Sequence, residues 1–219
     1  MTGAAPATEG DMTVFARSTT VQADRQAIDA GIAHIRDEVL PALQRMDGCV
    51  GLSMLVDRDS CRCIATSSWE SKAAMRLAAG PVGVIRDRAV EILGGTALVE
   101  EWEILVMHRA RPTHPGVCAR TTWLQMDPAA IDRAIDVYRI VTLPAMQELH
   151  GFCSASLLVN RENGRAVSTS TYDNRMAMER NRDRAAAVRS AGSLETGAEV
   201  LQVCEFELAV AHLRVPEMA

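Results

Sequence analysis

The stretch ARSTTVQADRQAID, residues 16–29, is written a second time at residues 119–132 as ARTTWLQMDPAAID. The two segments are related by a shift of 103 positions, and their alignment continues without a gap from residue 16 through residue 76. Of the 61 aligned pairs, 24 are identical, which is far above the matching of unrelated sequences. The sequence therefore predicts two copies of one domain in tandem along the chain.

The composition is typical of a globular chain. The 219 residues carry a net charge of -5 and are 48% hydrophobic, which gives each half enough apolar material for a core. A negative chain lacks the positive field that attracts nucleic acid, and no segment reaches the roughly 18 consecutive apolar residues of a membrane helix. The start, MTGAAPATEGDM, lacks the features of a secretion signal. We expect a cytoplasmic protein with a flexible leader at residues 1–11 and with no nucleic-acid or membrane partner.

Each copy reads as strand, helix, strand, strand, helix, strand. Asp24 is placed to cap the first helix, and Asp127, followed by proline, is placed to do the same in the second copy. Gly48 and Gly151 are the expected helix terminators. This βαββαβ order predicts the α+β class, with two ferredoxin-like repeats that each have a four-stranded antiparallel sheet and two helices on one face. The expected strands include residues 14–22, 49–56, 61–67 and 97–108 in the first copy and 152–159, 165–170 and 200–212 in the second.

A second repeated motif marks the passage from the third strand into the second helix. It is TSSWES at residues 66–71 and TSTYDN at residues 169–174. Ser71 and Asp173 are the expected N-caps. The stretch GPVG at residues 80–83 is expected to break the second helix in the first copy, whereas the second copy is expected to continue unbroken.

These features carry a resemblance to a known family. A strand that ends in an aromatic residue followed by an acid (Trp69-Glu70, Tyr172-Asp173), in a unit of about 100 residues, resembles the antibiotic biosynthesis monooxygenase-like domain of the dimeric α+β barrel superfamily. The resemblance covers both repeats. It implies that the two sheets face each other, as two subunits do in that superfamily, and form an intrachain pseudo-dimeric α+β barrel that leaves further homo-oligomerisation open.

The resemblance also implies a division of the chain and a buried interface. Repeat 1 is expected at residues 12–109 and repeat 2 at residues 117–214, with a linker at 110–116 and a tail at 215–219. The sheet-to-sheet interface is expected to bury apolar residues of both final strands, namely Trp102, Ile104, Phe206 and Leu208.

The family includes cofactor-independent oxygenases, haem-degrading enzymes, small-lactone isomerases and members without known activity, so residues must discriminate. Haem ligation would need a histidine on the second helix, and residues 71–93 and 173–192 contain none. A flavin or nicotinamide would need a glycine-rich phosphate loop between strand and helix, which is also missing. We therefore expect no cofactor.

Cofactor-free oxygenation needs a pocket that holds the anion of an aromatic or quinol-like substrate. Arg17 and Arg120 are the candidates to hold that anion, because the guanidinium never loses its charge. His108, matched by His212, is the candidate base. The residues that the resemblance implies as walls of the pocket are Thr19, Trp69, Thr122 and Tyr172.

Alternative interpretations remain for these residues. The two arginines could be exposed or paired with an acid, and Glu101 and Glu205 recur as candidate solvent-facing acids. Arginines between residues 175 and 189 could form an anion site, although the interleaved acids favour a solvated ion-pair face. The competing function is a non-catalytic module that binds a small apolar ligand or serves in a stress-related interaction.

The six cysteines predict no metal site. None of them recurs at the equivalent position of the other copy, and no second Cys or His pair stands at zinc-like spacing from Cys61 and Cys63. Reduced, structural thiols are the expectation.

Overall fold

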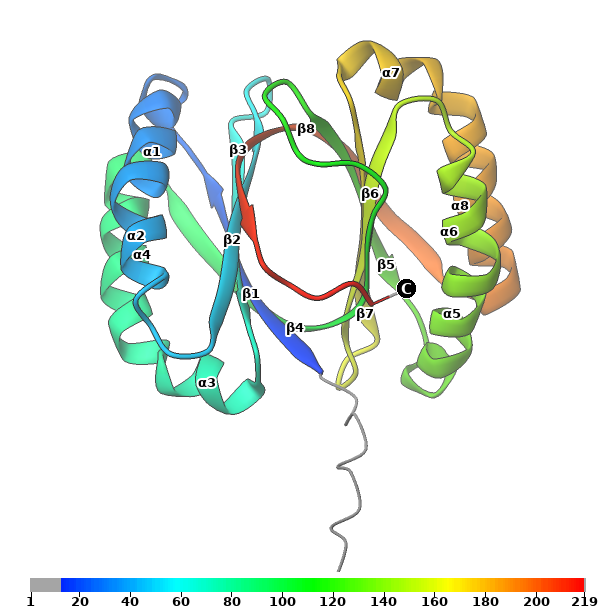
Figure 1. Ribbon diagram of the computed structural model, residues 1–219, viewed down its shortest axis with the longest axis horizontal. Coiled ribbons are helices and arrows are strands. Elements are labelled where there is room, and N and C mark those ends of the chain that lie inside the picture. Colours follow the sequence, from blue (N-terminus) through cyan, green and yellow to red (C-terminus); the bar gives the residue numbers. More distant parts are fainter. Residues whose placement is uncertain (1–12, 219) are drawn as a thin grey trace, which may run out of the picture.

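The computed structural model describes residues 13–218, and its centre is a closed barrel of eight antiparallel strands in the order β1-β3-β2-β8-β5-β7-β6-β4. Helices cover the barrel on two opposite sides (Figure 1). The strands are β1 (Val14–Gln22), β2 (Cys49–Asp57), β3 (Arg62–Trp69), β4 (Thr96–Arg109), β5 (Cys118–Gln125), β6 (Phe152–Asn160), β7 (Arg165–Tyr172) and β8 (Glu199–Leu213).

The helices of the first half are η1 (Arg25–Ala27), α1 (Ile28–His34), η2 (Ile35–Val39), α2 (Leu40–Leu43), α3 (Lys72–Leu77) and α4 (Ala79–Leu93). Those of the second half are η3 (Pro128–Ala130), α5 (Ile131–Val137), η4 (Tyr138–Thr142), α6 (Leu143–Gln147), α7 (Arg175–Arg180) and α8 (Arg182–Thr196). The order of elements in residues 14–93 is repeated in residues 118–196. Within residues 13–218, none of the helices combines the length and the apolar character that crossing a membrane requires.

The long strands β4 and β8 hold the two halves of the barrel together. The first part of β4 pairs with β1, and its last part, from Glu103, pairs with β6. In the same way β8 pairs first with β5 and then, from Glu207, with β2. Each final strand therefore belongs to the sheets of both halves.

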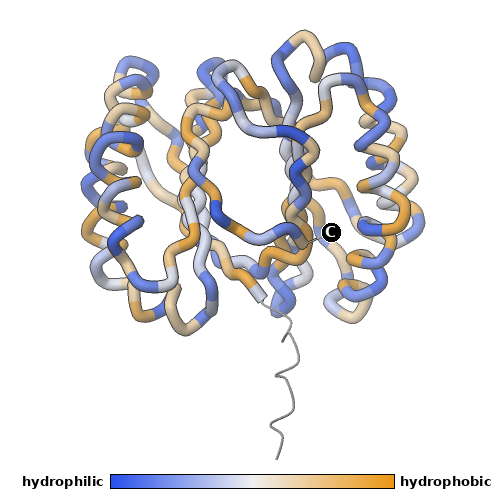
Figure 2. Tube along the Cα trace, in the orientation of Figure 1, coloured by the Kyte–Doolittle hydropathy of each residue, from blue (hydrophilic) through white to orange (hydrophobic). Residues whose placement is uncertain are grey.

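Strand periodicity separates two environments in the barrel wall. Because neighbouring side chains on a strand point to opposite faces, Ser18 faces the interior while Arg17 and Thr19 face the helices. The helix side holds the two largest apolar clusters, one in each half. Hydrophobic and hydrophilic positions are interspersed along the chain (Figure 2). In the interior, Trp102, Ile104 and Phe206 are buried, as expected of the two final strands, and Leu208 is half-buried.

The first helix of each half contains the same irregularity. A π-helical turn, η2 or η4, directly precedes the residue pair Leu40-Pro41 or Leu143-Pro144. Proline has no N–H to donate and its ring crowds the preceding turn, so the wider turn accommodates it. The Asp24 and Asp127 carboxylates each accept from a backbone N–H in the first turn, as predicted.

The cap of α7 differs from the prediction. Ser71 accepts from the N–H of Ala74 as expected, but Asn174, not Asp173, accepts from the N–H of Ala177. Asp173 instead receives the guanidinium of Arg111 at 2.7 Å. The acid therefore attaches the connecting segment to the second half, and the amide beside it caps the helix.

The break in the second helix was also misplaced. In the first half α3 ends before Ala78 and α4 continues through Gly80–Gly83, with Pro81 in its first turn, where proline is tolerated. In the second half α7 and α8 are interrupted at Asn181, the equivalent position. Both halves of the chain therefore bend at equivalent places, and the stretch GPVG does not determine the bend.

The connection between the halves joins β4 to β5 through residues 110–117. The expected tail at residues 215–219 pairs with the barrel as far as Met218, whose N–H and carbonyl bond to Met107. The expected leader at residues 1–11 lies outside the described residues.

Candidate functional site

Cavities lie on both faces of the barrel wall in the described part of the chain. Two lie between sheet and helices at equivalent places in the two halves, with volumes of about 60 Å³ in the first half and about 70 Å³ in the second. The third, of about 410 Å³, fills the middle of the barrel. The cavity of about 70 Å³, between β5, β6 and β7 on one side and α5, η4 and α8 on the other, is called the second-half pocket here.

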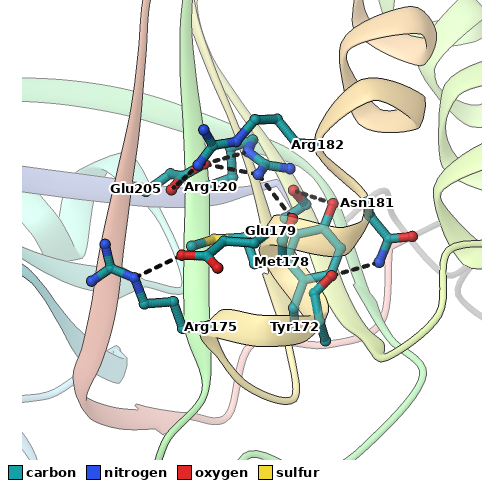
Figure 3. Close-up of polar contacts among 10 residues, drawn as sticks. Arg120, Tyr172, Arg175, Met178, Glu179, Asn181, Arg182 and Glu205 are labelled. Atoms are coloured by element: carbon teal, nitrogen blue, oxygen red, sulfur yellow. Dashed lines mark hydrogen bonds and ion pairs between the residues drawn. The ribbon is translucent and has the colours of Figure 1, made fainter.

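Arg120 is the charged group at the wall of the second-half pocket. It lies on β5, is 4% exposed, and donates through Nη2 to Glu205 at 2.8 Å and to the carbonyl of Met178 at 3.0 Å (Figure 3). Arg182 also reaches Glu205, at 3.3 Å. The guanidinium lies 5.7 Å from the centre of the Tyr172 ring. Strand, helix and acid together fix the direction of this side chain.

One nitrogen of Arg120 has no partner among the described residues. The Nη1 atom is buried and forms no hydrogen bond there, although a buried donor of this kind is costly to leave unpaired. Arg189, on α8, lines the same pocket. Burial lowers the pKa of Arg189, and the positive charge of Arg120 lowers it further. The two arginines thus bring two positive charges to the wall of one small cavity, and an anion is the kind of ligand that offsets their repulsion.

The other polar groups of the pocket are hydroxyls. The Tyr138 hydroxyl lies 3.2 Å from Ser168 Oγ, and burial raises the pKa of Tyr138 to about 12. The phenol is therefore a neutral hydrogen-bonding group at physiological pH. The described lining of this pocket includes no carboxylate and no imidazole. These residues therefore provide no ordinary general base.

Comparison of α8 with α4 shows why the second-half pocket differs from its counterpart. In the first half α4 packs bulky apolar residues, among them Val82 and Leu93, against the sheet. In the second half Ala185 is the only described residue of α8 that is buried. At a shift of 103 positions, an arginine faces both pockets, Arg86 and Arg189, whereas four other pairs differ: Val82 and Ala185, Ala89 and Gly192, Val90 and Ser193, and Leu93 and Thr196. The second half has thus replaced core bulk with small and polar side chains.

The residues predicted from sequence are distributed over several environments. Arg17 and Thr19 line the first-half cavity, but Nη2 of Arg17 lies 2.6 Å from Glu101, so that arginine is engaged in an ion pair. Arg120 and Thr122 line the second-half pocket.

The aromatic pair and the histidine lie elsewhere. Trp69 and Tyr172 are 0% exposed, belong to the two core clusters and line none of the three cavities. His108 contacts Gln147 at 2.7 Å and Glu217 at 2.5 Å, outside both helix-side cavities.

The sequence analysis did not identify Tyr138 as a site residue. It assigned Arg189, with its neighbouring arginines, to a solvent-exposed ion-pair face. Two other arginines of that face do form ion pairs, Arg175 with Glu179 at 3.1 Å and Arg182 with Glu205 at 3.3 Å. The signal for Arg189 was present in the repeat, because Gly192, Ser193 and Thr196 follow it where the first copy has apolar residues.

One group of potential metal ligands lies at the connecting segment. Atoms of His114, Cys153 and Asp173 are within 4.8 Å of one another. Burial, followed by the hydrogen bond to Asp173, raises the pKa of Cys153 to about 12, and its thiol donates to that carboxylate at 3.2 Å. Arg111 occupies the other oxygen of Asp173. A protonated thiol and an acid already paired with an arginine make a poor ligand set for zinc.

Proteins of similar sequence occur in Mycobacterium tuberculosis. The chain is 55% identical to the uncharacterized protein Rv2557 over 219 residues, covering 99% of this chain and 97% of that protein. It is also 55% identical to the uncharacterized protein Rv2558 over 218 residues, covering 99% and 92%. No family model matches the chain.

Solved structures with the same fold are distant in sequence. A candidate monooxygenase from Fusobacterium nucleatum matches with a TM-score of 0.70 at 9% identity, over 93% of this chain and 96% of that chain. An anthrone oxidase-like protein matches with a TM-score of 0.64 at 12% identity, over 96% of each chain. A ferredoxin-fold protein related to antibiotic biosynthesis monooxygenases, from Listeria monocytogenes, matches with a TM-score of 0.51 at 9% identity, over 90% and 95%. At these identities the likeness concerns the fold.

Proposed function

Because the chain belongs to one family with the Mycobacterium tuberculosis proteins Rv2557 and Rv2558 and has the fold of monooxygenase-related proteins, we propose that it binds a small organic anion in the second-half pocket. The observation that carries this proposal is the buried, unpartnered Nη1 of Arg120 beside a mostly apolar cavity. A phenolate or enolate oxygen would give this donor the acceptor that it lacks. Arg189 would add a second positive charge.

The reaction that fits this set of groups is oxygenation of an aromatic or quinol-like substrate without a cofactor. Arg120 stabilises the substrate anion, and the apolar walls keep water away from it. The electron-rich anion then reacts directly with dioxygen. In the simplest case a CH₂ carbon of the substrate becomes a carbonyl, one oxygen atom enters the product, and the other leaves as water.

The size of the pocket sets a condition on this reaction. Its volume of about 70 Å³ is less than half of the roughly 150 Å³ that holds a benzene ring in an engineered cavity. A phenol-sized substrate therefore enters only if α8 moves outward. The small and polar face of α8, with one buried residue, gives this helix less apolar packing to lose than α4 has.

The test is oxygen consumption by the full chain over a panel of phenols, quinols and anthrone. Arg120→Gln is expected to lower the rate at least tenfold, since about 2 kcal/mol or more of charge-assisted bonding to the anion is removed. Arg120→Lys, which keeps the charge, should restore part of it. Arg17→Gln is the matched control in the first half. If the rate of oxygen consumption falls in Arg120→Gln and not in Arg17→Gln, the reaction belongs to the second-half pocket. Equal rates in the folded parent protein and in Arg120→Gln would refute the assignment.

A second candidate function is binding without catalysis. The observation that favours it is the described lining of the second-half pocket, which contains no carboxylate or imidazole to remove a proton from the substrate. In that case the same panel would yield saturable binding that depends on Arg120, with no uptake of oxygen.

We also propose that the two repeats take the place of two subunits. Support comes from the strand order, since β4-β1-β3-β2 and β8-β5-β7-β6 are the same arrangement joined by the pairs β2–β8 and β6–β4. Halves expressed separately, split within residues 110–117, should associate with each other or aggregate, because each would expose unpaired strand edges. Two soluble and monomeric halves would contradict this proposal.

A further inference from the structure

The barrel interior contains the largest of these three cavities, and it is separate from the second-half pocket. Its volume of about 410 Å³ lies within the range of about 300–1,000 Å³ that is usual for small-molecule sites. Barrels of eight strands are either filled by their own side chains or hold one small ligand. Two apolar clusters, around Trp102 and around Phe206, fill part of this barrel and leave the cavity between them.

The wall of this cavity is unusually rich in hydroxyls. Four pairs recur at the shift of 103 positions, which are Ser18 and Thr121, Ser53 and Ser156, Thr66 and Thr169, and Ser68 and Thr171. The motifs TSSWES and TSTYDN thus send their first and third residues into the barrel and their second and fourth toward the helices. Core packing explains the outward pair, whereas it does not call for hydroxyls on the inward side.

Several of these hydroxyls are buried and retain hydrogen-bonding capacity. Ser68 is 2% exposed and lines the cavity. Ser18 accepts from the indole of Trp102 at 2.8 Å, which leaves its own proton free to donate. The indoles of Trp102 and Trp123 also line the cavity. The walls therefore offer two aromatic surfaces and hydroxyls that can both donate and accept.

A positive group lies at one end of the cavity. Arg109 donates through Nη1 to the carbonyl of Val215 at 2.8 Å, but its Nη2 is buried without a partner among the described residues. Its backbone N–H meets the carboxylate of Glu217. Arg111 and His212 stand at the same lining, and Arg111 is paired with Asp173. The described lining contains no carboxylate.

Two segments cross one end of the barrel. The connecting segment and the C-terminal residues run across the same opening of the barrel (Figure 1), and both are largely hydrophilic (Figure 2). The N–H of Arg214 bonds to the carbonyl of Val50 at 2.7 Å, which holds the C-terminal segment at the rim.

We propose that the barrel interior is a second ligand site, separate from the second-half pocket, for an aromatic organic anion that carries hydrogen-bonding oxygens. The anionic group lies at Nη2 of Arg109, the ring stacks near Trp102 and Trp123, and the wall hydroxyls bond to the oxygens. The site does not depend on the function proposed for the second-half pocket, because it uses the opposite face of the strands.

The experiment uses two fluorescent probes with the full chain. Anilinonaphthalene sulfonate is an aromatic anion, and N-phenylnaphthylamine is its uncharged parent. Both should bind the native protein saturably with one molecule per chain. Arg109→Gln should weaken binding of the sulfonate about tenfold, which corresponds to roughly 1.4 kcal/mol and to the loss of one hydrogen bond to a charged group. Binding of the uncharged probe should not change.

Cavity-filling variants locate the bound probe. Ser156→Phe should weaken both probes, since the ring would occupy the barrel cavity, whereas Ser193→Phe, in the second-half pocket, should weaken neither. Circular dichroism establishes that each variant is folded, and if Ser156→Phe fails to fold, the Arg109→Gln comparison decides alone. The proposal is overturned if neither probe binds the native chain, if Arg109→Gln affects both probes equally, or if Ser193→Phe and not Ser156→Phe abolishes binding.

Discussion

Gly192 and Ala89 occupy equivalent positions in α8 and α4, and exchanging their identities tests the interpretation of the second-half pocket. Gly192 lies in the helix interior, where replacement by alanine is worth about 1 kcal/mol of helix propensity. The added methyl would point toward Thr142, whose Oγ1 lies 3.1 Å from the new Cβ position. Burial of that methyl contributes about 0.8 kcal/mol, which the tight contact offsets in large part. We expect Gly192→Ala to raise the free energy of unfolding by about 1 kcal/mol.

The reverse change in the first half is the matched control. Ala89 is buried, so Ala89→Gly loses both the propensity and the methyl and should cost about 2 kcal/mol. Urea unfolding followed by far-ultraviolet circular dichroism measures both. For a chain of this length each kcal/mol shifts Tm by about 2–4 °C.

The exchange also reports on function. A more stable Gly192→Ala protein that binds its ligand less well would indicate that glycine is kept there for space rather than for stability. The reasoning fails if Gly192→Ala destabilises the protein by 1 kcal/mol or more, or if Ala89→Gly has no measurable cost. Either result would mean that the two helix faces are not packed as described.

Three further predictions follow from the fold. Ser71→Ala and Asn174→Ala should each lower the free energy of unfolding by about 1 kcal/mol, as the loss of a helix cap does, and equal stability of the Asn174 variant and its parent would contradict the observed cap. Trp69→Phe should cost roughly 2 kcal/mol or more, because a fully buried ring and its bond to Ser67 are lost; a neutral result in urea unfolding would return this ring to a pocket role. Burial raises the pKa of Cys63 to about 11 and of Cys153 to about 12, so at about pH 9 iodoacetamide should label these thiols last in peptide mass maps. Because the unfolded thiols ionise near pH 8.5 while the folded ones stay protonated, stability should decline as the pH rises above that value, and rapid labelling of Cys153 in the native protein would be the contrary outcome.

The regular elements could be predicted because both copies repeat the same local signals. β1 was placed at its observed bounds, since residues 14–22 are rich in threonine and other β-branched residues. The cap after Tyr172 was available from the repeat, because the shift of 103 positions aligns the cap Ser71 with Asn174 and aligns Asp173 with Glu70. The bend at Ala78 has no local signal, and tertiary packing sets it.

The site was less accessible to sequence reasoning. Arg120 was found because it recurs, and its pairing with Glu205 matches the alternative of an arginine held by an acid. The two cavities are equivalent in position, and only one has a small and polar helix face. That difference depends on which residues of the helix point to the sheet, and in the second half these include Gly192 and Ser193. The hydroxyls of the barrel interior were not predicted, because they belong to consecutive runs such as residues 66–68 and 168–171, and such runs do not say which members face inward.

The closing pairs of the barrel constrain how the protein is made. β2 is synthesised early, yet its partner β8 is the last strand, and Gly51 pairs with Leu213 near the end of the chain. On the ribosome the first half therefore waits with an open strand edge until nearly the whole chain has emerged. Contacts between such distant positions slow folding, and an exposed edge is a template for pairing with other nascent chains. Premature termination shortly before residue 207 would leave this edge uncovered for good, so the shortened products should be prone to aggregation and proteolysis even though most of their elements can form.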